Sequence, residues 1–205
     1  MLGLFLGLPV VLFFMRHDFR AWLMVTILVF ATICTIVLLL DKTFDRKRLW
    51  NRAGLKTEIG RILIFLLVLT TIPVAYLAFT EPERLFAFPR RAIVTWIFVM
   101  VLYPILSAYP QEIIFRAFFF HRYRSLFEKE STMITASAVA FGLAHLFLAN
   151  WIAPVFATFG GLLFSWTYAR SHSTLAAGVE HALWGNVLFT TGLGWYFYAG
   201  SIGAT

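Results

Sequence analysis

Long apolar stretches separated by short polar segments make up most of the chain. A helix that crosses a membrane needs about 20 mostly apolar residues. Stretches that approach or reach this length occupy residues 21–40, 62–79, 92–120, 132–148, 151–168 and 175–193, and a shorter one occupies residues 2–15. This pattern predicts an all-α, polytopic integral membrane bundle of about six to eight transmembrane helices, with residues 2–15 either as a first span or as an interfacial helix.

Two prolines in the middle of the chain permit two arrangements of the helix there. Pro104 and Pro110 both lie in the apolar region that runs from residue 92 to residue 127. Proline removes a helical hydrogen bond and kinks or breaks a helix. The region therefore forms either one long kinked helix or two pieces.

Composition supports the membrane assignment. The chain has 205 residues, of which 60% are hydrophobic and 13% are charged. A soluble domain is about 45–50% apolar and about 25% charged. We therefore expect one transmembrane domain over residues 1–205. The single cysteine, Cys34, excludes a cysteine-rich metal site.

Membrane topology explains the net charge of +7. Basic residues concentrate in the polar segment 41–61, which the positive-inside rule assigns to the cytoplasm. Anionic lipid head groups account for this charge, so we expect the lipid bilayer as a partner and no nucleic acid. The predicted location is a cell membrane, specifically the bacterial inner membrane. The basic residues of this segment are Lys42, Arg46, Lys47, Arg48, Arg52, Lys56 and Arg61.

A few ionisable residues interrupt the apolar stretches. Of the 10 acidic residues, only Glu112 and Glu180 lie inside such a stretch, and of the 5 histidines only His145 and His181 do. Charge at membrane depth is costly, so these residues indicate a functional site. The alternative is that each serves packing, as an ion pair or a hydrogen-bonded polar group between helices.

The first cluster contains Gln111, Glu112 and Arg116. Glu112 and Arg116 are four residues apart, so they share a helix face and can pair. Gln111 is rotated by about 100° from Glu112, and its amide could donate to a substrate. In the second cluster, Phe141 shares a face with His145 and could wall the site.

The third cluster contains Glu180, His181 and Asn186. Asn186 lies about 140° from His181 on an ideal helix, so both reach one site only if Gly185 permits a distortion. Peptide hydrolysis needs a base to activate water and donors for the oxyanion, and these residue types supply both.

The three clusters resemble the motifs of the CPBP family, which contains the CAAX proteases and bacteriocin-processing enzymes also called Abi proteins. The family pattern is Glu-Glu-x-x-x-Arg, then Phe-x-x-x-His, then His-x-x-x-Asn or a similar residue. Residues 92–193 carry it in this order and form the predicted catalytic core. The resemblance implies an intramembrane endopeptidase that uses a glutamate-activated water and cleaves near the C-terminus of a membrane-tethered protein or peptide.

The chain departs from this pattern at two positions. Gln111 stands where the family has its first glutamate, the usual base, so Glu112 matches the supporting glutamate. Either Glu112 or His145 is then the base, or the chain is inactive. Gly185 occupies the asparagine position, and Asn186 is shifted by one.

The main hypothesis assigns catalytic roles to six residues. Glu112 and His145 activate water, Arg116 positions Glu112, and His181 stabilises the oxyanion together with Gln111 or Asn186. We expect no cofactor.

Three alternatives remain open at this point. Zn²⁺ could be held by Glu112, His145 and His181, a set of two histidines and one carboxylate. An inactive member could instead bind a membrane partner or confer bacteriocin immunity. A transporter is less favoured because the sequence shows no repeated halves.

Overall fold

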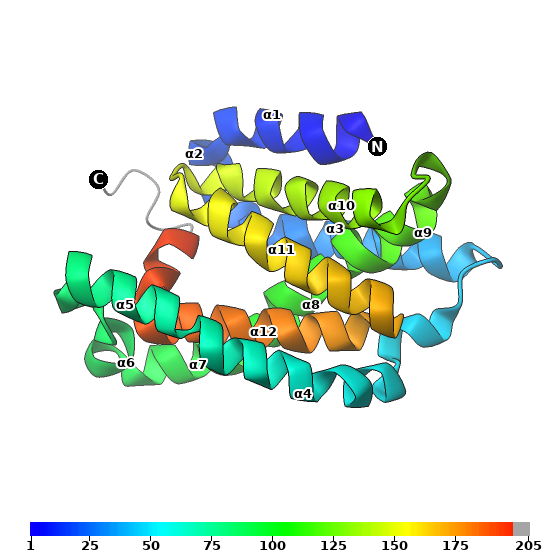
Figure 1. The fold of residues 1–205 in the computed structure, drawn as a ribbon. Helices are drawn as coiled ribbons and strands as arrows, with labels where there is room; N and C mark the ends of the chain where they lie inside the picture. The colour runs from blue at the N-terminus through cyan, green and yellow to red at the C-terminus, as the bar shows by residue number, and fades with distance from the viewer. Residues whose placement is uncertain (199–205) are drawn as a thin grey trace.

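The computed structural model describes residues 1–198, and these residues form helices and connecting turns without a strand. This confirms the predicted all-α class (Figure 1). The helices are α1 (Leu8–Phe14), α2 (Arg16–Phe19), α3 (Leu23–Leu40), α4 (Arg52–Leu69), α5 (Thr71–Thr80), α6 (Ala87–Arg91), α7 (Ile93–Tyr103), α8 (Tyr109–Glu112), α9 (Phe119–Tyr123), α10 (Glu130–Ala144), α11 (Ile152–Ser171) and α12 (Thr174–Thr191).

Several of these helices join into runs long and apolar enough to cross a membrane. Among the described residues, 5 runs qualify by length and composition: Arg16–Leu40, Arg52–Thr80, Ile93–Leu126, Glu130–Leu148 and Ile152–Ser171. The chain is therefore an integral membrane protein. The sixth predicted span corresponds to α12, which has 18 residues but carries Glu180, His181 and Asn186 and is less apolar.

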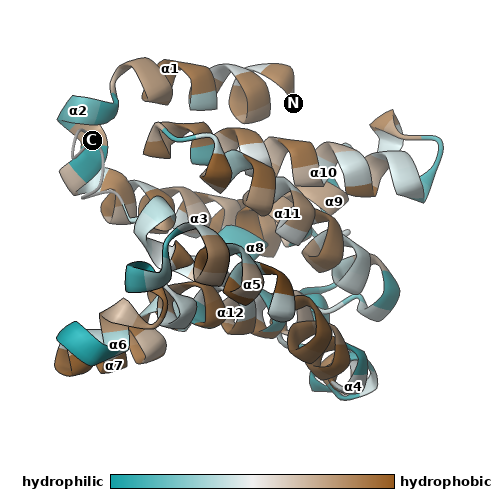
Figure 2. Cartoon of the chain, turned by 60° about the vertical axis from the view of Figure 1, so that its left-hand side comes forward, coloured by the Kyte–Doolittle hydropathy of each residue, from teal (hydrophilic) through white to brown (hydrophobic). Residues whose placement is uncertain are grey.

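The outer faces of these helices match a lipid environment. Large apolar side chains stand out from the bundle, including Phe79, which is 89% exposed, and Leu67, which is 77% exposed. Figure 2 shows apolar residues along the long helices and hydrophilic residues at α2 and in the connections between helices. Extended apolar surface of this kind indicates contact with a membrane.

The structure decides the questions left open at the N-terminus and around the prolines. Residues Gly3–Phe14 form a helix shorter than a membrane span. The prolines do not break the central region, because Ile93–Leu126 is one continuous helical run. Widened π-type turns at Pro104–Ala108 and Ile113–Phe118 absorb the irregularity within this run.

The basic segment is shorter than predicted. Residues 52–61 belong to α4, because Asn51 caps this helix by accepting a hydrogen bond from Gly54 N at 3.1 Å. The loop therefore ends at residue 51. At its start, Asp41 accepts hydrogen bonds from the Thr43 hydroxyl at 2.7 Å and from His121 Nε2 at 2.9 Å. These bonds hold the pKa of the Asp41 carboxyl well below its usual range.

Helix α12 lies in the interior of the bundle, where it packs against α4, α7, α8 and α11 (Figure 1). Next to α11, helix α10 approaches closely because the residues between them are small. A Cβ atom added at Gly161 would lie only 3.0 Å from Ala138 Cα. The small residues therefore let the backbones of α10 and α11 lie against each other.

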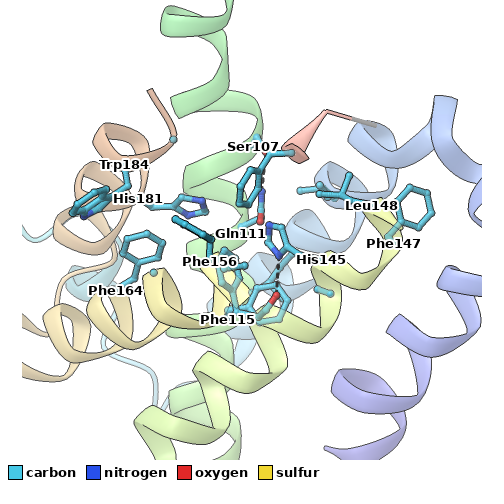
Figure 3. A pocket seen from close by; sticks show the side chains of 18 of the residues that line it. Ser107, Gln111, Phe115, His145, Phe147, Leu148, Phe156, Phe164, His181 and Trp184 are labelled. Atoms are coloured by element: carbon cyan, nitrogen blue, oxygen red, sulfur yellow. Dashed lines mark hydrogen bonds between the residues drawn. The ribbon is translucent and has the colours of Figure 1, made fainter. Parts of the chain in front are cut away.

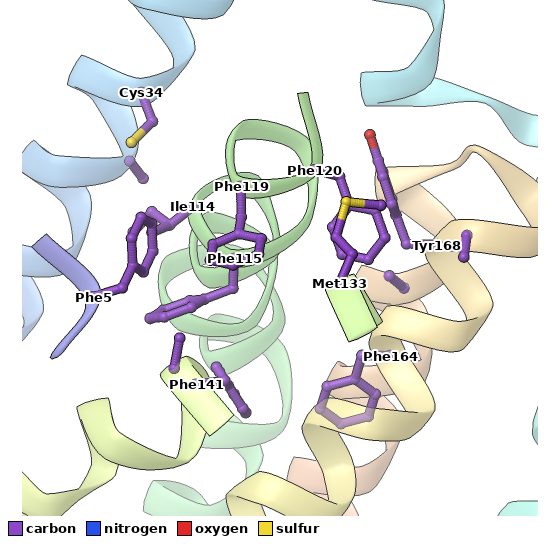
Figure 4. Packing of buried hydrophobic residues seen from close by; sticks show 14 of the residues in the cluster. Phe5, Cys34, Ile114, Phe115, Phe119, Phe120, Met133, Phe141, Phe164 and Tyr168 are labelled. Carbon is purple, nitrogen blue, oxygen red and sulfur yellow. The ribbon is translucent and has the colours of Figure 1, made fainter. Parts of the chain in front are cut away.

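Aromatic side chains fill the space between these helices (Figure 4). The Phe115 ring lies 5.2 Å from the Phe141 ring and 5.6 Å from Phe5, in edge-to-face arrangements. Phe5 belongs to the N-terminal helix, so the core ties this short helix to the bundle. Edge-to-face aromatic pairs add about 0.5–1.5 kcal/mol beyond the area they bury.

A buried ionic network joins α4, α11 and α12. Glu180 is fully buried and pairs with Arg61 Nη1 at 3.5 Å and with the Thr167 hydroxyl. Arg61 also donates through Nε to Glu58 at 2.8 Å. Glu180 thus has a structural partner, as the packing alternative foresaw for this residue.

The network predicts an asymmetry between two arginine substitutions. Arg61→Met leaves the Glu180 carboxylate buried without its cation, and we expect a loss of about 3–5 kcal/mol in the free energy of unfolding. The control is Arg84→Met, which removes a more exposed pair with Glu81 (2.8 Å, 37% and 22% exposed). For this control we expect the free energy of unfolding to fall by about 1 kcal/mol or less. Thermal unfolding in detergent measures both, and equal losses would contradict the role of the network.

Candidate active site

The central helical run carries a buried ion pair. Glu112 Oε2 lies 3.0 Å from Arg116 Nε, and both side chains have no exposed surface. The pairing predicted from their spacing is therefore present. Arg116 also lies against the Phe141 and Phe164 rings, at 4.6 Å and 5.4 Å from their centroids, and donates to the Gly161 carbonyl at 3.3 Å. These contacts fix the guanidinium within the core.

The second oxygen of Glu112 reaches α12. Glu112 Oε1 lies 2.8 Å from His181 Nδ1, so the carboxylate bridges the central run and α12. The His181 ring is stacked on Phe164 at 4.7 Å with an interplanar angle of 15°. With one ring nitrogen held by Glu112 and one face held by Phe164, only Nε2 of His181 is left for another partner.

His145 is anchored in a similar way at the end of α10. Its Nδ1 lies 2.8 Å from the Phe141 carbonyl oxygen. A carbonyl only accepts, so Nδ1 carries the proton, and Nε2 of the neutral ring is an acceptor. The Phe141 ring lies edge-on to both imidazoles, at 4.7 Å from His145 and 5.3 Å from His181. Phe141 thus forms the wall that the sequence suggested.

Both histidines line one large cavity. It has a volume of about 730 Å³, and apolar residues form most of its wall. Gln111 is the third predicted site residue on the wall, and its Nε2 donates to Ser107 Oγ at 2.8 Å. In Figure 3, the side chains of Gln111 and His145 point toward one another. A polar group of this kind within an apolar cavity suits the binding of a mostly apolar ligand with one reactive bond.

Glu112, Arg116 and Asn186 do not line this cavity. Glu112 and Arg116 lie behind His181. Asn186 points away, donating through Nδ2 to the Met100 carbonyl at 3.3 Å, as its position about 140° from His181 suggests. The structure therefore separates Asn186 from the other predicted site residues.

The sequence analysis missed other polar residues of the cavity. Tyr103, Ser107 and Trp184 all belong to its wall. Tyr103 and Ser107 precede Gln111 at intervals of four residues, which is the spacing of one helix face. That spacing was available in the sequence, but hydroxyl-bearing residues are common in apolar helices and did not stand out.

Glu112, His145 and His181 are the residues predicted as the alternative zinc ligands. Among residues 1–198, no group of three or more His, Cys, Asp or Glu side chains could hold a metal ion. Glu112 Oε1 faces His181 Nδ1, while His145 Nδ1 is directed to a carbonyl. Glu112 and His181 are thus bonded to one another, and His145 has Nε2 left for another partner.

Comparisons with known proteins place the chain in a family. No curated protein and no solved structure matched the chain. One family model matched residues 92–199, described as Type II CAAX prenyl endopeptidase Rce1-like. The match includes α7 to α12 and therefore the cavity-lining histidines and Gln111. Because it covers more than half of the 205 residues, the chain belongs to the Type II CAAX prenyl endopeptidase Rce1-like family.

Proposed function

We propose that this protein is an intramembrane endopeptidase that hydrolyses a peptide bond near the C-terminus of a membrane-associated protein or peptide. One observation carries the proposal. Two imidazoles, each held at Nδ1 by a buried acceptor, line the same apolar cavity as the Gln111 amide. This arrangement offers a base and hydrogen-bond donors within one space.

In the proposed reaction, His145 activates the water. Its Nε2 accepts a proton as the water oxygen attacks the carbonyl carbon of the scissile bond. The carbonyl oxygen becomes an oxyanion. In this proposal His181 is an imidazolium whose Nδ1–H donates to Glu112, and the oxyanion accepts from its Nε2–H and from the Gln111 N–H that Ser107 does not occupy. When the C–N bond breaks, the proton on His145 passes to the leaving amine.

Glu112 acts through His181 in this mechanism. Both of its oxygens are engaged, one with His181 and one with Arg116, and it does not reach the cavity wall. A carboxylate bonded to Nδ1 orients an imidazole and stabilises its charged form. We therefore assign water activation to His145 and keep Glu112 and Arg116 as positioning residues.

The site predicts how substitutions affect turnover. His145→Gln removes the base, and Glu112→Gln disturbs the proton arrangement at His181. We expect each to lower kcat by about 10²–10⁴-fold. His121→Gln is the matched control because His121 lies outside the cavity, bonded to Asp41. Cleavage of a membrane-tethered CAAX-type peptide, with and without a prenyl group, is the measurement. Unchanged kcat in both site variants would contradict the proposal.

A second candidate function is an inactive member that binds a membrane partner or confers bacteriocin immunity. The observation that favours it is the amide at Gln111, which bonds Ser107 within the cavity where the family pattern has a carboxylate. The near-isosteric substitution Gln111→Glu distinguishes the two functions, because it introduces the carboxylate of the family pattern while the size of the side chain stays the same.

We predict that Gln111→Glu lowers kcat, because a carboxylate at this position removes the N–H that faces the oxyanion. The expected reduction is about 10-fold or more. Peptide cleavage in reconstituted membranes measures it. If instead the parent chain is inert and Gln111→Glu cleaves, the parent is an inactive form, and the second candidate function replaces the first.

We also propose that the loop before α4 faces the cytoplasm of a bacterial cell. In a Cys34→Ser background, Lys47→Cys should react with a membrane-impermeant maleimide only after the cells are opened. Glu83→Cys, beyond the other end of the Arg52–Thr80 run, should react in intact cells. Both positions are exposed. The reverse labelling pattern would contradict this orientation.

A further inference from the structure

We infer that the Tyr103 hydroxyl is an additional catalytic donor, which binds the oxyanion beside His181. The inference rests on the proposed endopeptidase function and adds a residue that sequence reasoning did not select. Three features of Tyr103 support it: its place on the cavity wall, the space that Gly185 leaves for it, and its unused hydroxyl.

Tyr103 belongs to the face of the central run that carries the site. Tyr103, Ser107 and Gln111 are spaced by four residues, and all three line the cavity. The helical run is continuous across Pro104, so this spacing keeps the three side chains on one side. Tyr103 is thus the next polar group along the wall after Gln111 and Ser107.

Gly185 makes room for Tyr103 next to His181. It follows His181 by four residues, one turn along α12. A Cβ atom at Gly185 would collide with the ring and the hydroxyl oxygen of Tyr103. The phenol therefore occupies the space into which a side chain at position 185 would extend.

The Tyr103 ring is held in place on both sides. It lies edge-to-face with the His181 ring at 6.0 Å and with the Phe189 ring at 5.3 Å. These contacts hold the phenol beside the imidazole that the mechanism assigns to the oxyanion. A carbonyl oxygen bound between the two rings could accept from both, and donors fixed in advance are the most effective ones.

The Tyr103 hydroxyl has no hydrogen-bond partner among the described residues. Two tyrosines outside the cavity do have one: Tyr109 donates to the Leu49 carbonyl at 2.6 Å, and Tyr196 to Glu81 Oε1 at 2.6 Å. A hydroxyl in an apolar environment costs free energy unless it is bonded. The free O–H of Tyr103 is therefore available to a substrate oxygen.

The first experiment compares Tyr103→Phe with the parent in steady-state cleavage. The substitution removes one oxygen atom and keeps the ring that packs on His181 and Phe189. We expect kcat to fall by about 10²-fold while KM and thermal stability stay unchanged. Tyr76→Phe, a phenol outside the cavity on α5, is the matched control. A change in KM alone, or no change, would overturn the inference.

A rescue experiment tests the position of the donor. Tyr103→Ala should lose activity because it removes both the ring and the hydroxyl. Adding Gly185→Asn places an amide donor in the vacated space next to His181, and we expect it to recover at least part of the lost kcat. No recovery in a double variant that unfolds at the same temperature as Tyr103→Ala would count against an oxyanion role.

A binding experiment separates this inference from the proposed function. The probes are a CAAX-type peptide and its analogue with a phosphonate, which is tetrahedral and anionic, at the scissile carbonyl. If the parent does not prefer the phosphonate, both proposals fail. If the parent binds the phosphonate more tightly than the peptide and Tyr103→Phe abolishes this preference, the inference is supported. If Tyr103→Phe keeps the preference, the inference fails while the endopeptidase function stands.

Discussion

The bond between Glu112 and His181 is the interaction on which the site depends. It joins the central helical run to α12 inside a region with little water, where an unpaired carboxylate would be costly. Arg116 supplies the opposite charge at 3.0 Å, and the aromatic rings of Phe141 and Phe164 cover the guanidinium. One carboxylate thus links two helices and occupies Nδ1 of His181, which leaves Nε2 for another partner.

The other histidine depends on helix packing more than on charge. His145 ends α10, and its ring is held by the Phe141 carbonyl of the preceding turn. The small residues Gly161 and Ala138 let α11 and α10 approach closely, which brings Phe141 against the Arg116 guanidinium. Phe141 then lies edge-on to both imidazoles. The site is therefore assembled by close packing of small residues and by aromatic contacts around a single buried charge.

The sequence predicted what local spacing determines. The apolar stretches identified the spans, and the four-residue interval identified the Glu112–Arg116 pair. Spacing could not decide which polar groups point into the cavity, because that depends on how helices face one another. Asn186 is two residues beyond Trp184, yet of these two residues Trp184 lines the cavity and Asn186 does not. The start of α4 was placed too late, since charged residues hid a helix capped by Asn51.

Helix α12 is restrained from turning about its own axis. Glu180 and His181 are neighbours in sequence, but one is bound by Arg61 on α4 and the other by Glu112 on the central run. Any rotation that withdrew His181 from Glu112 would also pull Glu180 from its cation, so two buried charges would lose their partners together. Rotation of α12 about its own axis is therefore costly, because it would break ionic contacts to two different helices at once.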